Sequence, residues 1–139
     1  GHFWASAYER DGEYGGLGLP GSVPQEALAP RTKGSAGQST TLCVVATDAA
    51  LTKVQARRLA VMAQDGLARA LHPVHTPLDG DIVFAISTGK VALADPLRDL
   101  VAIGSEAAHC AARAIARGVY LADTAPLADM PPAWQAKFG

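Results

Sequence analysis

The chain has 139 residues, of which 28 are alanine, with 49% hydrophobic and 18% charged side chains and a formal net charge of −1. This composition excludes general disorder and predicts one globular domain, or part of one, that is large enough to fold without a disulfide or a metal. Twelve basic residues balance thirteen acidic ones, so no strong field favours nucleic acid or an anionic membrane as a partner.

The apolar runs and the two cysteines indicate whether the chain crosses a membrane and in which compartment it folds. The longest apolar run that resembles a strand core, Leu42 to Ala46, has five residues, which excludes a transmembrane helix. Cys43 and Cys110 lack Cys-x-x-Cys spacing, so we expect both to be reduced, buried side chains in a cytoplasmic protein. The chain begins with Gly1 and has no secretory signal in residues 1–20, which indicates a processed product or a fragment.

The first 39 residues predict little regular structure. Residues 1–21 carry aromatic side chains and then Gly15, Gly16 and Gly18, a pattern that favours a short strand and a glycine turn; no Gly-Lys-Ser/Thr follows to make a phosphate loop. Residues 22–39 are rich in proline, glycine and serine. They predict an exposed connection that is open to cleavage.

From Thr40 onward the pattern predicts a β-α-β-α unit. Thr41 to Thr47 is β-branched and nearly continuously apolar, which is typical of a strand buried on both faces, and Asp48 ends it. Thr52 and Gln55 form a capping-box pair. We therefore expect a helix from Thr52 to about Leu71, before Pro73.

The second half of that unit is predicted in the same way. Ile82 to Ser87 reads as a strand, and Asp95 with Pro96 begins a second helix that Arg117 and Gly118 close. Within this helix the spacing of Gly104 and Ala108 favours close backbone approach. The remaining tail should be irregular and should pack through Trp134 and Phe138.

Five short motifs carry a resemblance that composition and periodicity do not give. Their order along the chain resembles that of the self-cleaving aminopeptidase family typified by the L-aminopeptidase/D-esterase DmpA, over nearly the whole chain. Within it the chain looks most similar to the nylon-oligomer hydrolase branch (endo-type 6-aminohexanoate-oligomer hydrolase), since threonine stands at the nucleophile position and the acidic motif is Asp-Gly-Asp. The motifs are His2-Phe3-Trp4, Gly15-Gly16-Leu17-Gly18, Ser39-Thr40-Thr41, Asp79-Gly80-Asp81 and Ser87-Thr88-Gly89.

The resemblance implies a fold, a processing event and a set of catalytic residues. The fold would be an αββα four-layer sandwich, of the type that ornithine acetyltransferases share, with this chain the C-terminal segment of a longer precursor. The precursor would cut itself between Ser39 and Thr40, which leaves residues 1–39 as the end of the large chain and 40–139 as the small chain. Thr40 would be the nucleophile, with Asp79 and Asp81 near it, and the heterodimers would assemble into homo-oligomers.

The implied chemistry is reasonable on independent grounds. An N-terminal threonine carries its own base, because an α-amino group has a pKa of about 7.7–8.0 and accepts a proton near neutral pH. Two carboxylates one residue apart could orient the hydroxyl and hold the amine. The sequence does not assign either aspartate to one of these roles. The implied substrate is a short peptide, another amide or ester, or a 6-aminohexanoate oligomer, and no cofactor is needed.

Each motif also has a structural interpretation. Threonine at a strand start is ordinary β-propensity, and Asp-Gly-Asp before a strand is ordinary turn chemistry. His72 and His75 lie near the aspartates, but they lack a sustained ligand pattern, so we expect a solvated loop and no metal. The glycine motif most simply supplies special backbone angles, although it could also face substrate. Cys43 has no activating histidine or helix N-terminus nearby and is read as core.

Two departures and two rival functions remain. Only 39 residues precede Thr40, so the oxyanion-site asparagine and the lysine or tyrosine that the family's large chain supplies are absent, and Ser39 replaces the asparagine of the nylon-oligomer hydrolase branch. An oxyanion donor is worth roughly 3–4 kcal/mol in rate, so this chain alone should be nearly inactive. The rivals are a non-catalytic αββα assembly or ligand-binding protein and an ornithine acetyltransferase relative, whose Met-Ala-Thr-Met-type cleavage site is not found here.

Overall fold

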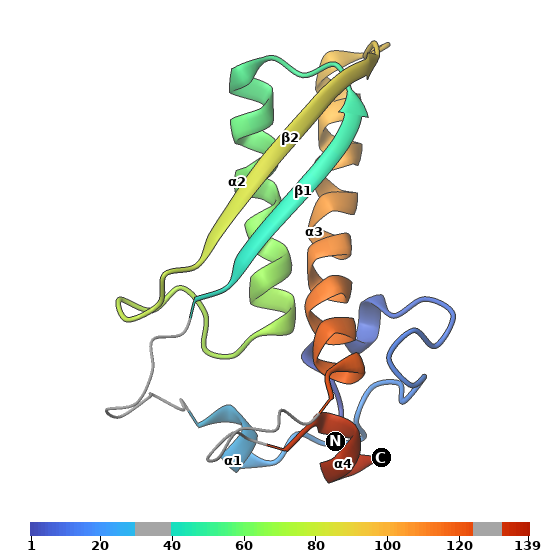
Figure 1. Cartoon of the computed structure of the whole chain (residues 1–139), viewed down its shortest axis with the longest axis vertical. Coiled ribbons are helices and arrows are strands. Elements are labelled where there is room, and N and C mark those ends of the chain that lie inside the picture. Colours follow the sequence, from blue (N-terminus) through green and yellow to red (C-terminus); the bar gives the residue numbers. More distant parts are fainter. Residues whose placement is uncertain (30–39, 124–131) are drawn as a thin grey trace.

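A computed structural model describes residues 1–29, 40–123 and 132–139. The predicted cleavage site at Ser39, and Pro126 and Pro131 of the tail, lie outside these described residues. The chain is a mixed α/β structure in which two strands cross one layer of two long helices (Figure 1). In chain order the elements are η1 (a 3₁₀ helix, Trp4–Tyr8), α1 (Gln25–Leu28), β1 (Leu42–Ala49), α2 (Lys53–Ala70), β2 (Ile82–Val91), α3 (Pro96–Leu121) and α4 (Trp134–Phe138).

The predicted β-α-β-α unit is confirmed. β1 and β2 pair in parallel, with partners from Leu42↔Ile82 to Thr47↔Ser87, and α2 makes the crossover between them. The Thr52 hydroxyl accepts the Gln55 N–H, and the Gln55 side chain accepts the Thr52 N–H at 2.8 Å, which completes the predicted capping box. The Asp95 carboxylate likewise accepts N–H groups of the first turn of α3.

Three predicted element ends were too early. β1 passes Asp48 to Ala49, β2 continues four residues beyond Ser87 to Val91, and α3 runs past Gly118 to Leu121. The Ala50 N–H donates to the Val91 carbonyl at 2.7 Å, so the far ends of both strands are held together after a register shift near Thr47. These extensions depend on pairing between distant segments, which local propensity does not contain.

The prediction that the first strand is buried on both faces was wrong. The strands alternate instead, and only one face of the sheet packs against the helices, where Val83 is 8% exposed. The opposite face carries large apolar side chains, and among them Leu42, Val44, Phe84 and Ile86 are each more than half exposed. Both faces of the sheet are therefore apolar, but the described residues cover only one of them.

Small residues bring α2 and α3 together. A Cβ atom added at Gly66 of α2 would lie 2.3 Å from the Ala108 carbonyl oxygen and 2.7 Å from the Ala111 Cβ. At Gly104 of α3 an added Cβ would lie 2.3 Å from Met62 Cε. The predicted close backbone approach is confirmed at Ala108, whose backbone lies against Gly66, whereas Gly104 is packed by the Met62 side chain.

The N-terminal segment forms a 3₁₀ helix where a short strand was predicted. In η1 the Phe3 carbonyl accepts both the Ser6 N–H (3.1 Å) and the Ser6 hydroxyl (2.7 Å), so local hydrogen bonds outweigh the β-propensity of the aromatic residues. Phe3 then packs edge-on against Tyr14 and stacks on Trp134. The tail thus packs through its aromatic residues as expected, with α4 as a short helix.

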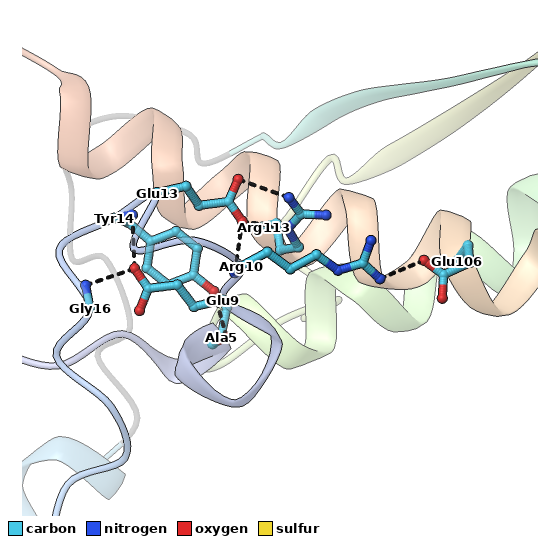
Figure 2. Close-up of polar contacts among 8 residues, drawn as sticks. All are labelled: Ala5, Glu9, Arg10, Glu13, Tyr14, Gly16, Glu106 and Arg113. Carbon is cyan, nitrogen blue, oxygen red and sulfur yellow. Dashed lines mark hydrogen bonds and ion pairs between the residues drawn. The ribbon is translucent and has the colours of Figure 1, made fainter.

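Polar contacts fix this segment to α3 (Figure 2). Glu9 accepts the N–H groups of Tyr14 and Gly16, each at 2.9 Å, and the Tyr14 hydroxyl donates to the Ala5 carbonyl at 2.7 Å. Burial raises the pKa of Tyr14 to about 12, so the phenol keeps the proton that it donates. Arg113 of α3 donates two hydrogen bonds to the carboxylate of Glu13.

The pair of Glu13 and Arg113 predicts a pH-dependent contribution to stability. The Arg113 hydrogen bond holds the pKa of Glu13 below its ordinary value of 4.5, and the two side chains are 15% and 20% exposed. A carboxyl with a lowered folded-state pKa contributes stability above pH 4.5, and that contribution is lost as the pH falls through the lowered value. We expect Glu13→Gln to cost about 1–2 kcal/mol at pH 7.

The measurement is the urea midpoint of unfolding of the whole protein at pH 7 and below pH 4.5. The difference between wild type and Glu13→Gln should shrink at the lower pH. Glu106→Gln is the matched control, because Glu106 pairs with Arg10 on the surface, and it should change the midpoint far less. Equal effects of the two variants at both pH values would contradict the prediction.

Candidate active site

Thr40 and the Asp-Gly-Asp motif meet at one end of the sheet. Thr40 lies two residues before β1 and is exposed, and Asp79-Gly80-Asp81 comes directly before β2. Because the strands are parallel and Leu42 pairs with Ile82, the residues that precede the strands lie side by side. A Cβ atom added at Gly80 would lie only 2.7 Å from the Thr40 hydroxyl oxygen.

Asp81 ties the start of β1 to the loop before β2. Its side chain is 5% exposed, and its Oδ1 accepts the Thr41 N–H at 2.9 Å. The Thr41 carbonyl in turn accepts the Ile82 N–H at 3.0 Å. Both backbone groups of Thr41 are therefore held by residues 81 and 82, which fixes the segment that carries Thr40.

His75 supports Asp81 from the other side. Asp81 Oδ2 accepts the His75 N–H at 3.3 Å and lies 3.3 Å from His75 Nδ1. His75 has a φ of +56°, a left-handed conformation that is uncommon outside glycine. Sequence analysis missed this contact and treated His75 as part of a solvated loop; the one available signal was a histidine six residues before an aspartate within a loop.

Asp79 closes a turn in the same loop. Its Oδ2 accepts the Thr76 N–H at 2.9 Å, and its own N–H donates to the Thr76 carbonyl at 3.0 Å. The motif thus acts as a turn, and it also lies beside Thr40. The two interpretations of Asp-Gly-Asp are compatible.

The other histidine of this loop contacts the N-terminal segment. The His72 ring lies 5.4 Å from the Trp4 ring, and its Nε2 is 3.2 Å from the Leu28 carbonyl oxygen. Within residues 1–29, 40–123 and 132–139, no three histidine, cysteine, aspartate or glutamate residues gather where they could hold a metal ion.

The remaining motifs have the local geometry that their structural interpretation expects. Gly15, Gly16 and Gly18 all have positive φ values, as the backbone interpretation of this motif expects. His2 Nδ1 lies 3.3 Å from the Gly18 carbonyl oxygen, which brings the first two motifs together. The Ser87 hydroxyl donates to the Ala49 carbonyl at 2.6 Å, at the opposite end of the strands from Thr40.

The two cysteines lie in different environments. Burial raises the pKa of the Cys43 thiol, which keeps it protonated and unreactive. Cys43 is half-buried and Cys110 is exposed, which corrects the prediction that both are buried. Both cysteines line an apolar cavity of about 510 Å³ between β1 and α3, which does not include Thr40.

A comparison with known families places the sequence in one of them. The sequence matches the model of peptidase family S58 over residues 7–130. The chain belongs to peptidase family S58. The predicted resemblance to an aminopeptidase family is thereby confirmed at the level of the family, and the matched range contains Thr40, Asp79 and Asp81.

Curated relatives of this S58 chain come from mycobacteria. An uncharacterized aminopeptidase of Mycobacterium tuberculosis (strain H37Rv) is 48% identical over 103 residues, covering 67% of this chain and 29% of the relative. An uncharacterized aminopeptidase of Mycobacterium leprae is 46% identical over 96 residues, covering 62% and 26%. The chain therefore spans less than a third of the length of these relatives.

Among the helices that the structure describes, none is long and apolar enough to cross a membrane.

Proposed function

We propose that this chain belongs to a self-processing amidohydrolase that cleaves short peptides or related amides, with residues 40–139 as its catalytic small chain. Thr40 is the nucleophile, and it becomes an N-terminal residue when the bond after Ser39 is cut. The observation that carries the proposal is the meeting of an exposed threonine hydroxyl with the Asp-Gly-Asp turn at one end of two parallel strands. Membership of a peptidase family supports the same reaction class.

Self-cleavage would use the Thr40 hydroxyl on its own backbone. Its oxygen attacks the Ser39 carbonyl carbon, the bond from that carbon to the Thr40 nitrogen breaks, and the hydroxyl proton passes to the departing nitrogen. The resulting ester is then hydrolysed by water, which leaves a carboxylate on Ser39 and a free amine on Thr40. Asp81 favours this step because it fixes the Thr41 N–H and so limits the movement of the scissile bond.

Turnover of a substrate would follow the same chemistry. The freed Thr40 amine accepts the hydroxyl proton, Oγ1 attacks the amide carbonyl, the substrate amine leaves with that proton, and water releases the acid. The curated relatives are named aminopeptidases, which favours short peptides as the substrate class. We retain 6-aminohexanoate oligomers as the second substrate class, because threonine and Asp-Gly-Asp are shared with that branch.

The bare face of the sheet supports a larger assembly. We propose that Leu42, Val44, Phe84 and Ile86, all more than half exposed, pack against a second sheet from the large chain. Such packing would make an αββα four-layer sandwich, since the helices already cover the other face. The large chain would also cover the exposed Thr40 and supply the oxyanion donors, and heterodimers of this kind would join into homo-oligomers.

Intact-mass analysis of the purified full-length protein tests the proposal. We expect a small chain that begins at Thr40, together with hydrolysis of a peptide amide, and a parallel assay with a 6-aminohexanoate oligomer compares the two substrate classes. A single uncut polypeptide that still hydrolyses amides would refute the N-terminal-threonine mechanism. An uncut and inactive protein would favour the non-catalytic assembly instead.

A further inference from the structure

We propose that Gly80 positions the nucleophile. Because residue 80 has no side chain, the Thr40 hydroxyl can lie where a Cβ atom at position 80 would otherwise exclude it. The inference rests on the proposed function, because it assigns a role toward the Thr40 oxygen. It goes beyond the two aspartates, which act through their carboxylates. Gly80 is a positioning residue that acts through the absence of a side chain.

The contact geometry separates this role from ordinary turn chemistry. A Cβ atom at Gly80 would lie 2.7 Å from Thr40 Oγ1, 3.5 Å from Cγ2 and 3.6 Å from Cβ, and these are its three nearest atoms. Gly80 is absent from the described residues with positive φ, so its backbone conformation is open to alanine as well. The obstacle to a side chain at position 80 is therefore Thr40 itself.

The consequence of filling that space follows from the rotamers of threonine. The side chain has three staggered positions about χ1. Rotation one way would move the Cγ2 methyl into the place of Oγ1, still too close to a Cβ at position 80. Rotation the other way would avoid the contact but would carry the hydroxyl away from its present direction. Either rotation displaces the attacking oxygen, and the backbone conformation around Thr40 stays the same.

Gly80→Ala in the full-length protein is the primary test. We expect kcat for a peptide amide to fall about 100-fold, the loss that a displacement of about 1 Å causes at a reacting group. KM should stay within about twofold, because Gly80 faces the nucleophile and not the bound substrate. Self-cleavage should slow as well. The matched control is Gly21→Ala, since Gly21 has no heavy atom within 4 Å of an added Cβ and no positive φ; it should leave both rates unchanged.

A double-mutant cycle in stability shows whether the effect passes through Thr40. Thr40→Ala removes Oγ1 and Cγ2, two of the three atoms that a Cβ atom at position 80 would meet. Gly80→Ala should therefore lower the unfolding midpoint of the full-length protein and should change that of the Thr40→Ala variant less. Equal shifts in the two backgrounds would overturn the inference, because a merely structural defect at position 80 would not depend on the Thr40 side chain.

Thr40→Ala in the same assay separates this inference from the proposed function. If Thr40→Ala is inactive and Gly80→Ala behaves like wild type, the role of Gly80 is wrong and the nucleophile stands. If Thr40→Ala remains active, the proposed function itself fails. Thermal unfolding of each variant identifies a loss that comes from misfolding, and the stability cycle with Thr40→Ala then shows whether the contact with the Thr40 side chain is responsible.

Discussion

Thr40→Ala is expected to abolish self-cleavage and to lower amide hydrolysis in the full-length protein by at least about 1,000-fold. The substitution removes the oxygen that would form both the precursor ester and the acyl-enzyme, and loss of a catalytic nucleophile has effects of this size or larger. Thr40 is exposed and contributes little packing, so the unfolding midpoint should change little. Intact mass and the rate of peptide amide hydrolysis are the two measurements.

Two neighbouring variants make the result specific. Thr40→Ser keeps a hydroxyl and, after cleavage, an amine, so it should process itself and retain part of the activity. Thr41→Ala should be mild, because the structure uses the backbone of Thr41 to contact Asp81 and Ile82. Loss of cleavage in Thr41→Ala with normal cleavage in Thr40→Ala would move the nucleophile by one residue. If neither variant had an effect, the chain would have no threonine nucleophile at this position.

Asp81→Ala is expected to lower both self-cleavage and turnover about 100-fold without unfolding the protein. The substitution removes the acceptor for the Thr41 N–H and for the His75 N–H, so the start of β1 loses the contact that fixes Thr40 in place. The stability cost of leaving these donors without an acceptor is about 1–3 kcal/mol. Kinetics and urea unfolding should be measured on the same preparations.

The controls for Asp81 separate its two contacts. Asp81→Asn keeps one carbonyl oxygen that can accept the Thr41 N–H, so it should retain more activity than Asp81→Ala. His75→Gly removes the imidazole, keeps the backbone N–H that donates to Asp81, and accepts the positive φ without strain. We expect it to be mild. If His75→Gly is as harmful as Asp81→Ala, the contact of Asp81 with the imidazole matters more than its hydrogen bond to Thr41.

Local signals in the sequence were enough to predict the two long helices, α2 and α3, but not η1, α1 or α4. The Thr52 and Gln55 box and the Asp95-Pro96 pair each lie within four residues of the helix start that they cap, so the sequence contains the whole signal. The ends of β2 and α3 were harder to predict from the sequence, because Lys90, Val91 and Val119 are exposed. An exposed end has no clear pattern of burial from which to read its limit.

Burial and the site depended on contacts that no local pattern records. Val44 and Phe84 have the composition of buried strand residues, yet they are more than half exposed, because composition does not say which segment will cover a face. Thr40 and Asp81 were chosen by family resemblance. The contact of His75 with Asp81 could not be predicted, since it depends on a left-handed backbone at His75 within a proline-containing loop.

The contact between α2 and α3 is made by glycine and alanine residues, so at these positions it is sensitive to larger side chains and not to smaller ones. Gly66, Gly104 and Ala108 offer almost no side-chain atoms to delete, and a methyl group has no rotamers to freeze on folding. An alanine scan would therefore report nothing at Ala108, and at the two glycines it would enlarge the side chain instead of deleting atoms. Enlargement would report strongly, because even one carbon at Gly66 meets the Ala108 backbone. Only the smallest residues should be accepted at these positions. Substitutions to valine or leucine are therefore the ones that would identify which residues of α2 and α3 hold the two helices together.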